Sequence, residues 1–209
     1  MLFGEVAMKN VFKKIYYYVN YIRFNPYLDI NKIDKLLFVA HPDDEIIFFY
    51  KQLIQLDGLL VVCMTNGDSF TRSNEFVAAM KELDVKYKLL TFKDGINTHL
   101  VNEKVKKKVL QVFNIKQEWS MVLTHNQEGE YGHIQHRELN KLIREICKSR
   151  SIKVYVSCYK SQIENKVNKL SSKDKNMKIN IFKKYYKSQR DMLQNLSENF
   201  EYEGLKIEE

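Results

Sequence analysis

The fold of this chain is decided by one stretch near residue 40, Phe38-Val39-Ala40-His41-Pro42-Asp43-Asp44-Glu45. An apolar run, predicted to be a strand over residues 35–40, ends there in a turn that carries one imidazole and three carboxylates. Such a charged cluster is costly unless something binds it, and imidazole with carboxylate is the ligand combination that suits zinc. A catalytic zinc usually has three protein ligands. A further ligand is offered by His133 and His136, three residues apart at an expected helix start and therefore on one helical face.

Outward from this stretch, the chain alternates between strand patterns and helical periodicity. Further strands are predicted over residues 59–64, 87–92, 120–123 and 152–156, with helices between them. This alternation predicts an α/β, Rossmann-like three-layer fold, with a mainly parallel sheet of about five strands and helices on both faces. Ligands of such sheets bind at the carboxyl ends of the strands. The exits of the first four strands carry the chemically rich turns 41–45, 65–68, 94 and 125–136, which should therefore share one rim.

The 209 residues fit a single domain over 1–209, with a net charge of +8. Residues 148–190 contain thirteen Lys or Arg and two acids, a local charge of +11, so the rest of the chain carries −3. This excess favours either an anionic partner or a solvated lysine-rich face, and the solvated face is the simpler interpretation. The three cysteines have no metal-site spacing and indicate buried free thiols. Without a signal-peptide or membrane-span pattern, the expected location is cytoplasmic.

Two segments flank the alternating region. Residues 1–35 are predicted to be a helical N-terminal extension whose apolar stripe covers a domain edge or a subunit contact, with a membrane surface as the alternative; the stripe comprises Phe12, Ile15, Val19 and Ile22. Residues 159–177 are predicted to be a mobile basic loop that could act as a lid, followed by a helix over 178–196. The acidic tail after Ser197 is expected to fray.

The motifs together resemble those of the PIG-L/LmbE-like zinc-dependent N-acetylglucosaminyl de-N-acetylase family, from about Leu36 to Cys158. The resemblance rests on Ala40-His41-Pro42-Asp43-Asp44-Glu45, Thr65-Asn66-Gly67-Asp68, Arg72 with Glu75 and Ala79, and Gly129-Glu130-Tyr131-Gly132-His133-Ile134-Gln135-His136-Arg137. A weaker similarity appears in Lys178 and Tyr186-Lys187-Ser188-Gln189.

The resemblance implies roles for individual residues. The metal ligands would be His41, Asp44 and His136. Asp43 would be the general base that activates the water, and His133, assisted by Tyr131, the polarising or acid group at the oxyanion. The substrate would contact Asn66, Arg72, Asp94, Tyr186 and Gln189. Many family members have His-Pro-Asp-His where this chain has His133-Ile134-Gln135-His136, so the group that orients the ligands remains open.

The chemistry of the residue types agrees with amide hydrolysis, because zinc lowers the pKa of its water to roughly 7 and one of two adjacent aspartates can coordinate while the other accepts a proton. The expected function is removal of the acetyl group from an N-acetylated amino sugar (GlcNAc-type) conjugate by a zinc-activated water. Fe²⁺ would suit the same ligands. An anionic aglycone would match the basic third of the chain. No nucleic-acid partner is expected; peripheral membrane contact and a homo-oligomer are left open.

Two alternatives follow from the same residues. One is a zinc amidase that acts on a non-sugar acyl amide. The other is a basic protein with structural zinc that binds nucleic acid or an anionic surface, although few aromatic residues interleave with the lysines. Around the site, Glu45 is interpreted either as a residue that supports the metal ligands from behind or, more simply, as a helix N-terminal acid favoured by the helix dipole. His125 is interpreted either as an orienting group or as a structural hydrogen-bonding residue, and His99 as a surface residue.

Overall fold

A computed structural model describes residues 2–95, 97–158 and 168–208, and gives the backbone alone for residues 2–7. Its centre is a six-stranded sheet in the order β3-β2-β1-β4-β5-β8. Five parallel strands are β1 (Lys35–Val39), β2 (Leu59–Thr65), β3 (Lys86–Phe92), β4 (Met121–Thr124) and β5 (Val154–Ser157). The predicted α/β fold with a mainly parallel sheet is therefore confirmed. All seven residues of β2 are buried, as expected for a parallel strand covered on both faces.

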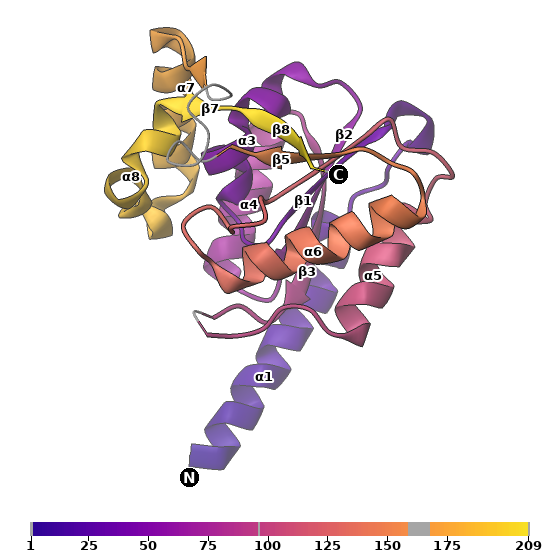
Figure 1. Ribbon diagram of the computed structural model, residues 1–209. Coiled ribbons are helices and arrows are strands. Elements are labelled where there is room, and N and C mark those ends of the chain that lie inside the picture. The colour runs from indigo at the N-terminus through magenta and orange to yellow at the C-terminus, as the bar shows by residue number, and fades with distance from the viewer. Residues whose placement is uncertain (1, 96, 159–167, 209) are drawn as a thin grey trace.

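Helices cover both faces of the sheet (Figure 1). One face is covered by α3 (Asp44–Gln55), α4 (Phe70–Glu82) and α7 (Ser172–Tyr185). The other face carries α5 (Glu103–Phe113) and α6 (Ile134–Ser149). Alternate strand residues enter the two cores: Leu37 and Val39 face the first set of helices, and Leu36 and Phe38 the second. The two apolar cores fix the strands in register and so bring their exits to one rim.

The C-terminal part differs from the sequence prediction. The predicted helix over 178–196 is wrong at both ends, because α7 begins earlier and ends at Tyr185, followed by the short helices η3 (Lys187–Gln189) and α8 (Met192–Asn195). The side chain of Ser171 caps α7 by accepting the Asp174 N–H at 3.0 Å. The part of the expected mobile loop 159–177 that the structure describes is ordered, with β6 (Asn168–Lys169) and the start of α7 in it; residues 159–167 lie outside the described residues.

The tail after Ser197 does not fray. It forms η4 (Ser197–Phe200), β7 (Tyr202–Glu203) and β8 (Leu205–Glu208), and β8 pairs antiparallel with β5 as the sixth strand. Two interactions hold it: Phe200 is buried in the core, and Lys178 Nζ donates to the Glu203 carboxylate at 2.5 Å. The prediction failed because short strands leave a weak local pattern, whereas the open edge of β5 is a tertiary feature.

The predicted N-terminal helix forms as α1 (Leu2–Val19), followed by α2 (Tyr21–Phe24) and η1 (Ile30–Lys32). Its apolar stripe does not cover the domain edge, the first of the contacts expected of it. Tyr16 and Tyr17 face the domain, where the Tyr16 hydroxyl lies 2.9 Å from Ser73 Oγ. The stripe points away from the domain, and the first turns of α1 extend beyond the body of the molecule (Figure 1). None of the described helices has the length and hydrophobicity needed to span a bilayer.

Candidate active site

A strained turn at the end of β1 builds the centre of the site. Asp43 has φ 121°, a backbone conformation that costs a non-glycine residue on the order of 1–3 kcal/mol. Its N–H donates to Glu45 Oε2 at 3.1 Å, and its carbonyl accepts the N–H groups of Ile46 and Ile47 in the first turn of α3. The turn lets the neighbouring carboxylates of Asp43 and Asp44 point to different partners. One can therefore coordinate a metal ion while the other accepts a proton.

Three predicted metal ligands converge. His41 Nδ1 lies 3.2 Å from His136 Nε2 and 3.3 Å from Asp44 Oδ2, and the third side of the triangle, from His136 Nε2 to Asp44 Oδ2, is 3.4 Å. Zinc bonds of about 2.0–2.1 Å in a tetrahedron place the ligand atoms about 3.3–3.4 Å apart. The triangle therefore has the size that a tetrahedral zinc ion requires, and its three side chains are buried.

Hydrogen bonds behind the two histidines fix which nitrogen faces the centre. His136 Nδ1 donates to Glu130 Oε2 at 2.7 Å, and His41 Nε2 donates to Gln135 Oε1 at 2.7 Å. Each proton is thus on the outer nitrogen, so two bare lone pairs face each other beside Asp44. Burial lowers the pKa of His41, but the carboxylates of Asp44 and Asp94 outweigh it and raise that pKa to about 10, so without a metal ion the inner nitrogen takes up a second proton near neutrality. The carboxylates thus favour positive charge at this centre, and a metal ion would take the place of that proton.

Two further histidines lie next to the triangle: His133 lies within metal-binding reach of His41 and His136, and His125 within reach of Asp44 and His136. His125 Nε2 accepts the Ala40 N–H at 3.0 Å and its Nδ1 donates to Glu130 at 3.1 Å, so the residue fastens the end of β1. His133 caps α6, with its Nδ1 accepting the Gln135 N–H at 3.3 Å. Burial lowers the pKa of His133 to about 4. The neutral ring then carries its proton on Nε2, which leaves a donor beside the metal ligands.

The predicted base, Asp43, pairs with Arg72. Its Oδ2 lies 3.3 Å from Arg72 Nη2, which also donates to the carbonyl of Pro42. Burial raises the pKa of Asp43 to about 6, and the guanidinium opposes this rise. Arg72, predicted to contact substrate, is thus largely occupied in holding Asp43; its buried Nη1 has no hydrogen-bond partner within the described part of the chain.

Asp43 is supported by buried residues for which the sequence analysis predicted other roles. Tyr186, predicted to close over the substrate, is fully buried, and its hydroxyl donates to Glu45 Oε1. Glu45 is itself inaccessible; it lies in the first turn of α3, as predicted, and it also accepts the Asp43 N–H. Ser188 donates from its N–H (2.7 Å) and hydroxyl (2.6 Å) to Glu75, which lies 4.0 Å from Arg72. The only sequence signal for this support was the weak similarity around residues 186–189.

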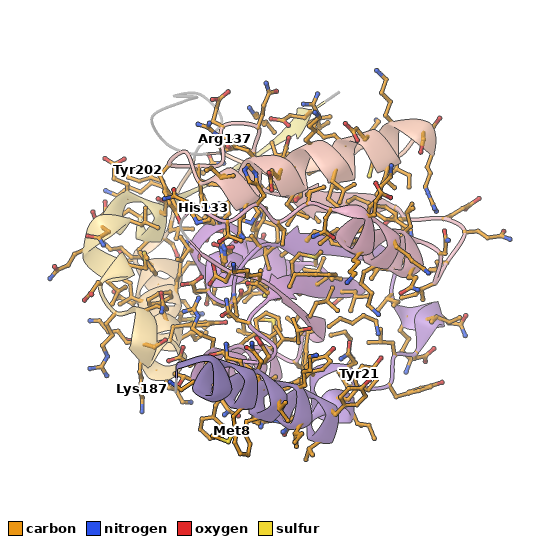
Figure 2. All side chains as sticks on the ribbon, turned by 90° about the horizontal axis from the view of Figure 1, so that it is seen from below. Met8, Tyr21, His133, Arg137, Lys187 and Tyr202 are labelled. Carbon is orange, nitrogen blue, oxygen red and sulfur yellow. The ribbon has the colours of Figure 1, made fainter. Side chains whose placement is uncertain are left out.

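Of the remaining predicted residues, Asn66, Asp94 and Tyr131 lie on the outer side of the centre. Asn66 Nδ2 donates to Asp94 Oδ2 at 2.8 Å, and Asp94 Oδ1 lies 3.2 Å from His41 Nε2. Tyr131 is 46 % exposed, with its ring centroid 5.7 Å from that of His136. Gln189 hydrogen-bonds to its neighbour Ser188. Figure 2 shows His133 and Arg137 on the side of the molecule opposite Met8 of α1.

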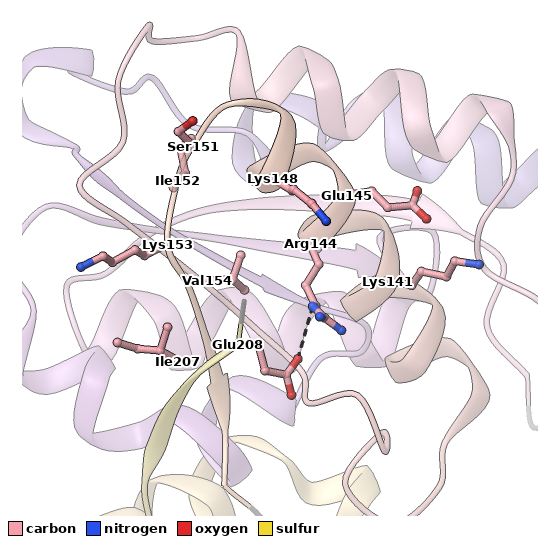
Figure 3. A pocket seen from close by; sticks show the side chains of 10 residues that line it. All are labelled: Lys141, Arg144, Glu145, Lys148, Ser151, Ile152, Lys153, Val154, Ile207 and Glu208. Atoms are coloured by element: carbon pink, nitrogen blue, oxygen red, sulfur yellow. Dashed lines mark ion pairs between the residues drawn. The ribbon is translucent and has the colours of Figure 1, made fainter.

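A separate hollow of about 630 Å³ lies between α6, β5 and β8 (Figure 3). Its lining includes Lys141, Arg144, Lys148, Lys153 and Glu208, and Arg144 Nε lies 3.7 Å from Glu208 Oε2. It shares no lining residue with the histidine cluster. The chemistry described above therefore does not take place there.

A family model described as PIG-L, GlcNAc-PI de-N-acetylase, matches residues 36–147, which include all the ligands of the triangle. The chain belongs to the PIG-L family. A curated relative of this PIG-L chain is uncharacterized protein L374 of Acanthamoeba polyphaga mimivirus, 37 % identical over 131 residues. That match spans 55 % of the chain and 58 % of the relative, so the chain covers little more than half of the relative's length.

Solved structures share the fold of this PIG-L chain. A triple mutant of a deacetylase from the teicoplanin biosynthetic pathway has a TM-score of 0.61 and 16 % identity, over 84 % of this chain and 99 % of that one. The A40926 pseudoaglycone deacetylase Dbv21 has a TM-score of 0.59 and 15 % identity, and the match covers 78 % of this chain and 85 % of that one. GalB, a 4-carboxy-2-hydroxymuconate hydratase of Pseudomonas putida KT2440, has a TM-score of 0.58 and 17 % identity. That match covers 84 % of this chain and 96 % of that one. At these identities the similarity shows a common fold.

Proposed function

We propose that this PIG-L family member is a zinc-dependent hydrolase that removes the acetyl group from an N-acetylated amino sugar, of GlcNAc type, within a larger conjugate. One observation carries the proposal: the triangle of His41, Asp44 and His136 has the dimensions of one face of a zinc tetrahedron. Three protein ligands leave a position open for chemistry, whereas structural zinc sites have four. The same ligands accept Fe²⁺.

A zinc ion held there would supply Lewis acidity for the amide carbonyl and lower the pKa of a water molecule. Asp43 is the base that takes a proton from the attacking water; its raised pKa of about 6 lets it accept that proton near neutrality. His133 donates from Nε2 to the developing oxyanion, where one such donor lowers the barrier by about 2.7–4 kcal/mol. Tyr131, half exposed beside His133, supplies a further hydroxyl at the mouth.

Substrate recognition is proposed for the outer residues. Asn66, Asp94 and Gln189 offer amide and carboxylate groups that suit sugar hydroxyls, and Arg72 Nη1, 4.0 Å from Glu75, has no hydrogen-bond partner among the described residues. An anionic aglycone would be attracted by the basic C-terminal third of the chain. We further propose one catalytic domain over residues 1–209 and a cytoplasmic location, which the three buried free cysteines support.

Two variants test the assignment. Asp43→Asn should keep its metal and lose turnover, while His136→Ala should lose both, as measured by metal content after dialysis and by acetate release from GlcNAc conjugates. Equal metal content in the two variants would refute the ligand set. Acetate from simple acyl amides, with none from any sugar conjugate, would instead favour a zinc amidase. Salt-sensitive binding of nucleic acid or anionic vesicles without hydrolysis would favour a binding protein with structural zinc.

A further inference from the structure

The side of α1 and α2 that faces away from the domain is an uninterrupted apolar stripe. Its seven members are each between 53 and 81 % exposed, although all are large and hydrophobic. They are Met8, Val11, Phe12, Ile15, Tyr18, Val19 and Ile22. Isolated apolar residues on a surface are ordinary, but a contiguous group of this kind indicates a binding surface.

The spacing of the stripe is that of a helix that packs along another helix. Met8, Val11, Ile15, Tyr18 and Ile22 follow one another at intervals of 3, 4, 3 and 4 residues, the a and d positions of successive heptads. Phe12 and Val19 fall at the e position and widen the stripe, as in helical bundles. The a positions are Met8, Ile15 and Ile22, and the d positions are Val11 and Tyr18, so every position of the seam is apolar or aromatic.

The opposite side of the same helix is already used. Tyr16, Tyr17 and Phe24 pack against the core, and Lys13 lies 3.8 Å from Asp68 in the turn after β2. The three lysines of α1 lie outside the stripe: Lys9 and Lys13 take the b and f positions, and Lys14 takes the g position that borders the seam. The helix is therefore anchored by one side while the other is presented for an intermolecular contact.

The amount of surface fits a stable pair of identical subunits. The exposed fractions of the seven side chains correspond to on the order of 700–900 Å² per copy, against roughly 800 Å² per partner in a standard interface. That is more than the roughly 300–600 Å² of the largest apolar patch on an ordinary monomer. An isologous contact uses the same patch twice, so a single stripe suffices for both subunits.

We propose that two copies of this chain associate through the stripe on α1 and α2, about a twofold axis, to form a homodimer with a helix-pair interface. This inference does not depend on the proposed deacetylase activity. Sedimentation velocity of the full chain should give a species of twice the 25.0 kDa monomer mass. Ile15→Asp, which would bury an unpaired carboxylate at the centre of the interface, should weaken association at least about 100-fold.

The matched control is Asn10→Asp, which adds the same charge to the same helix at an exposed position outside the stripe and should leave the dimer intact. Because Ile15 is 53 % exposed in the single chain, circular dichroism of the Ile15→Asp variant should match that of the parent. A parent chain that stays monomeric at all concentrations would overturn the proposal. So would a dimer that survives Ile15→Asp, or a monomer that co-floats with vesicles of phosphatidylcholine and phosphatidylserine through the stripe.

Discussion

Replacing Glu130 by glutamine should weaken metal binding while leaving the fold intact. Glu130 is 3 % exposed and lies in the loop before α6. Its Oε2 accepts the Nδ1–H groups of His136 (2.7 Å) and His125 (3.1 Å). Its Oε1 accepts the Asn126 N–H at 3.1 Å and the hydroxyl of Ser157. Burial opposes ionisation, but the two histidines outweigh it and hold the pKa of Glu130 well below its usual range, so the acceptor is a carboxylate.

The magnitude follows from these contacts. Glutamine has the same shape but only one acceptor oxygen, and its NH₂ must face either the two imidazole N–H groups or the Asn126 N–H and the Ser157 hydroxyl. In the first case His136 loses the partner that keeps its proton on Nδ1, so Nε2 is no longer held bare toward the centre. Changes of this kind cost 10–100-fold in metal affinity, which is about 1.4–2.7 kcal/mol.

Zinc affinity is measured by competition with a zinc chelator of known affinity. The midpoint of thermal unfolding is then measured with and without zinc. The control is Glu138→Gln: Glu138 also binds a histidine, His99, at 2.5 Å and the N–H of Leu100 at 2.7 Å, but away from the cluster. Glu138→Gln should leave zinc affinity unchanged. If Glu130→Gln binds zinc as tightly as the parent, the argument that this carboxylate sets the state of His136 is refuted.

Three further outcomes are expected. Tyr186→Phe removes the donor to buried Glu45 and should lower kcat about tenfold with metal content unchanged, whereas Tyr185→Phe, whose hydroxyl binds the exposed Glu82, should not; equal kcat in both would contradict a role in placing the base. Lys178→Met leaves the Glu203 carboxylate buried without its partner and should lower the free energy of unfolding by about 3–5 kcal/mol in urea titration; a loss below about 1 kcal/mol would show that the pair contributes little. Chelator treatment should abolish acetate release and lower the melting temperature, both restored by zinc; activity that persists after complete metal removal would exclude metal-dependent hydrolysis.

Much of the fold could be predicted because the strands of a buried parallel sheet are strongly apolar. Residues 59–64 were predicted as a strand on that basis, and β2 covers Leu59–Thr65. The alternation of strands and helices also predicted that the strand exits share one rim. It therefore predicted that His41 and His136, 95 residues apart in the sequence, lie close together. The prediction failed for the C-terminal tail. Its strand β8 is four residues long, and its place in the sheet depends on the free edge of β5.

Within the site, the direct ligands were predictable but their support was not. A histidine pair at a helix start has a sequence signature, because its spacing places both rings on one face. Tyr186 and Glu45 are 141 residues apart, and neither residue type in isolation indicates a buried hydrogen bond. The N-terminal stripe left its partner open for a related reason. Its periodicity identifies a helix with an apolar side, but whether that side meets the same chain or another one is decided by what packs on Tyr16 and Tyr17.

The glutamine at position 135 follows from the charge around His41. Gln135 Oε1 lies 2.7 Å and Asp94 Oδ1 3.2 Å from the same nitrogen, His41 Nε2, which has one proton to donate. A carboxylate at position 135 would place two negative charges on that proton, and like charges so close disfavour ionisation of one of them. An amide avoids this repulsion. Its oxygen still fixes the His41 tautomer, and its NH₂ donates to the Lys93 carbonyl at 3.0 Å, so that side chain cannot rotate away. Asp94 thus supplies the negative charge beside His41 Nε2, and Gln135 supplies the orientation.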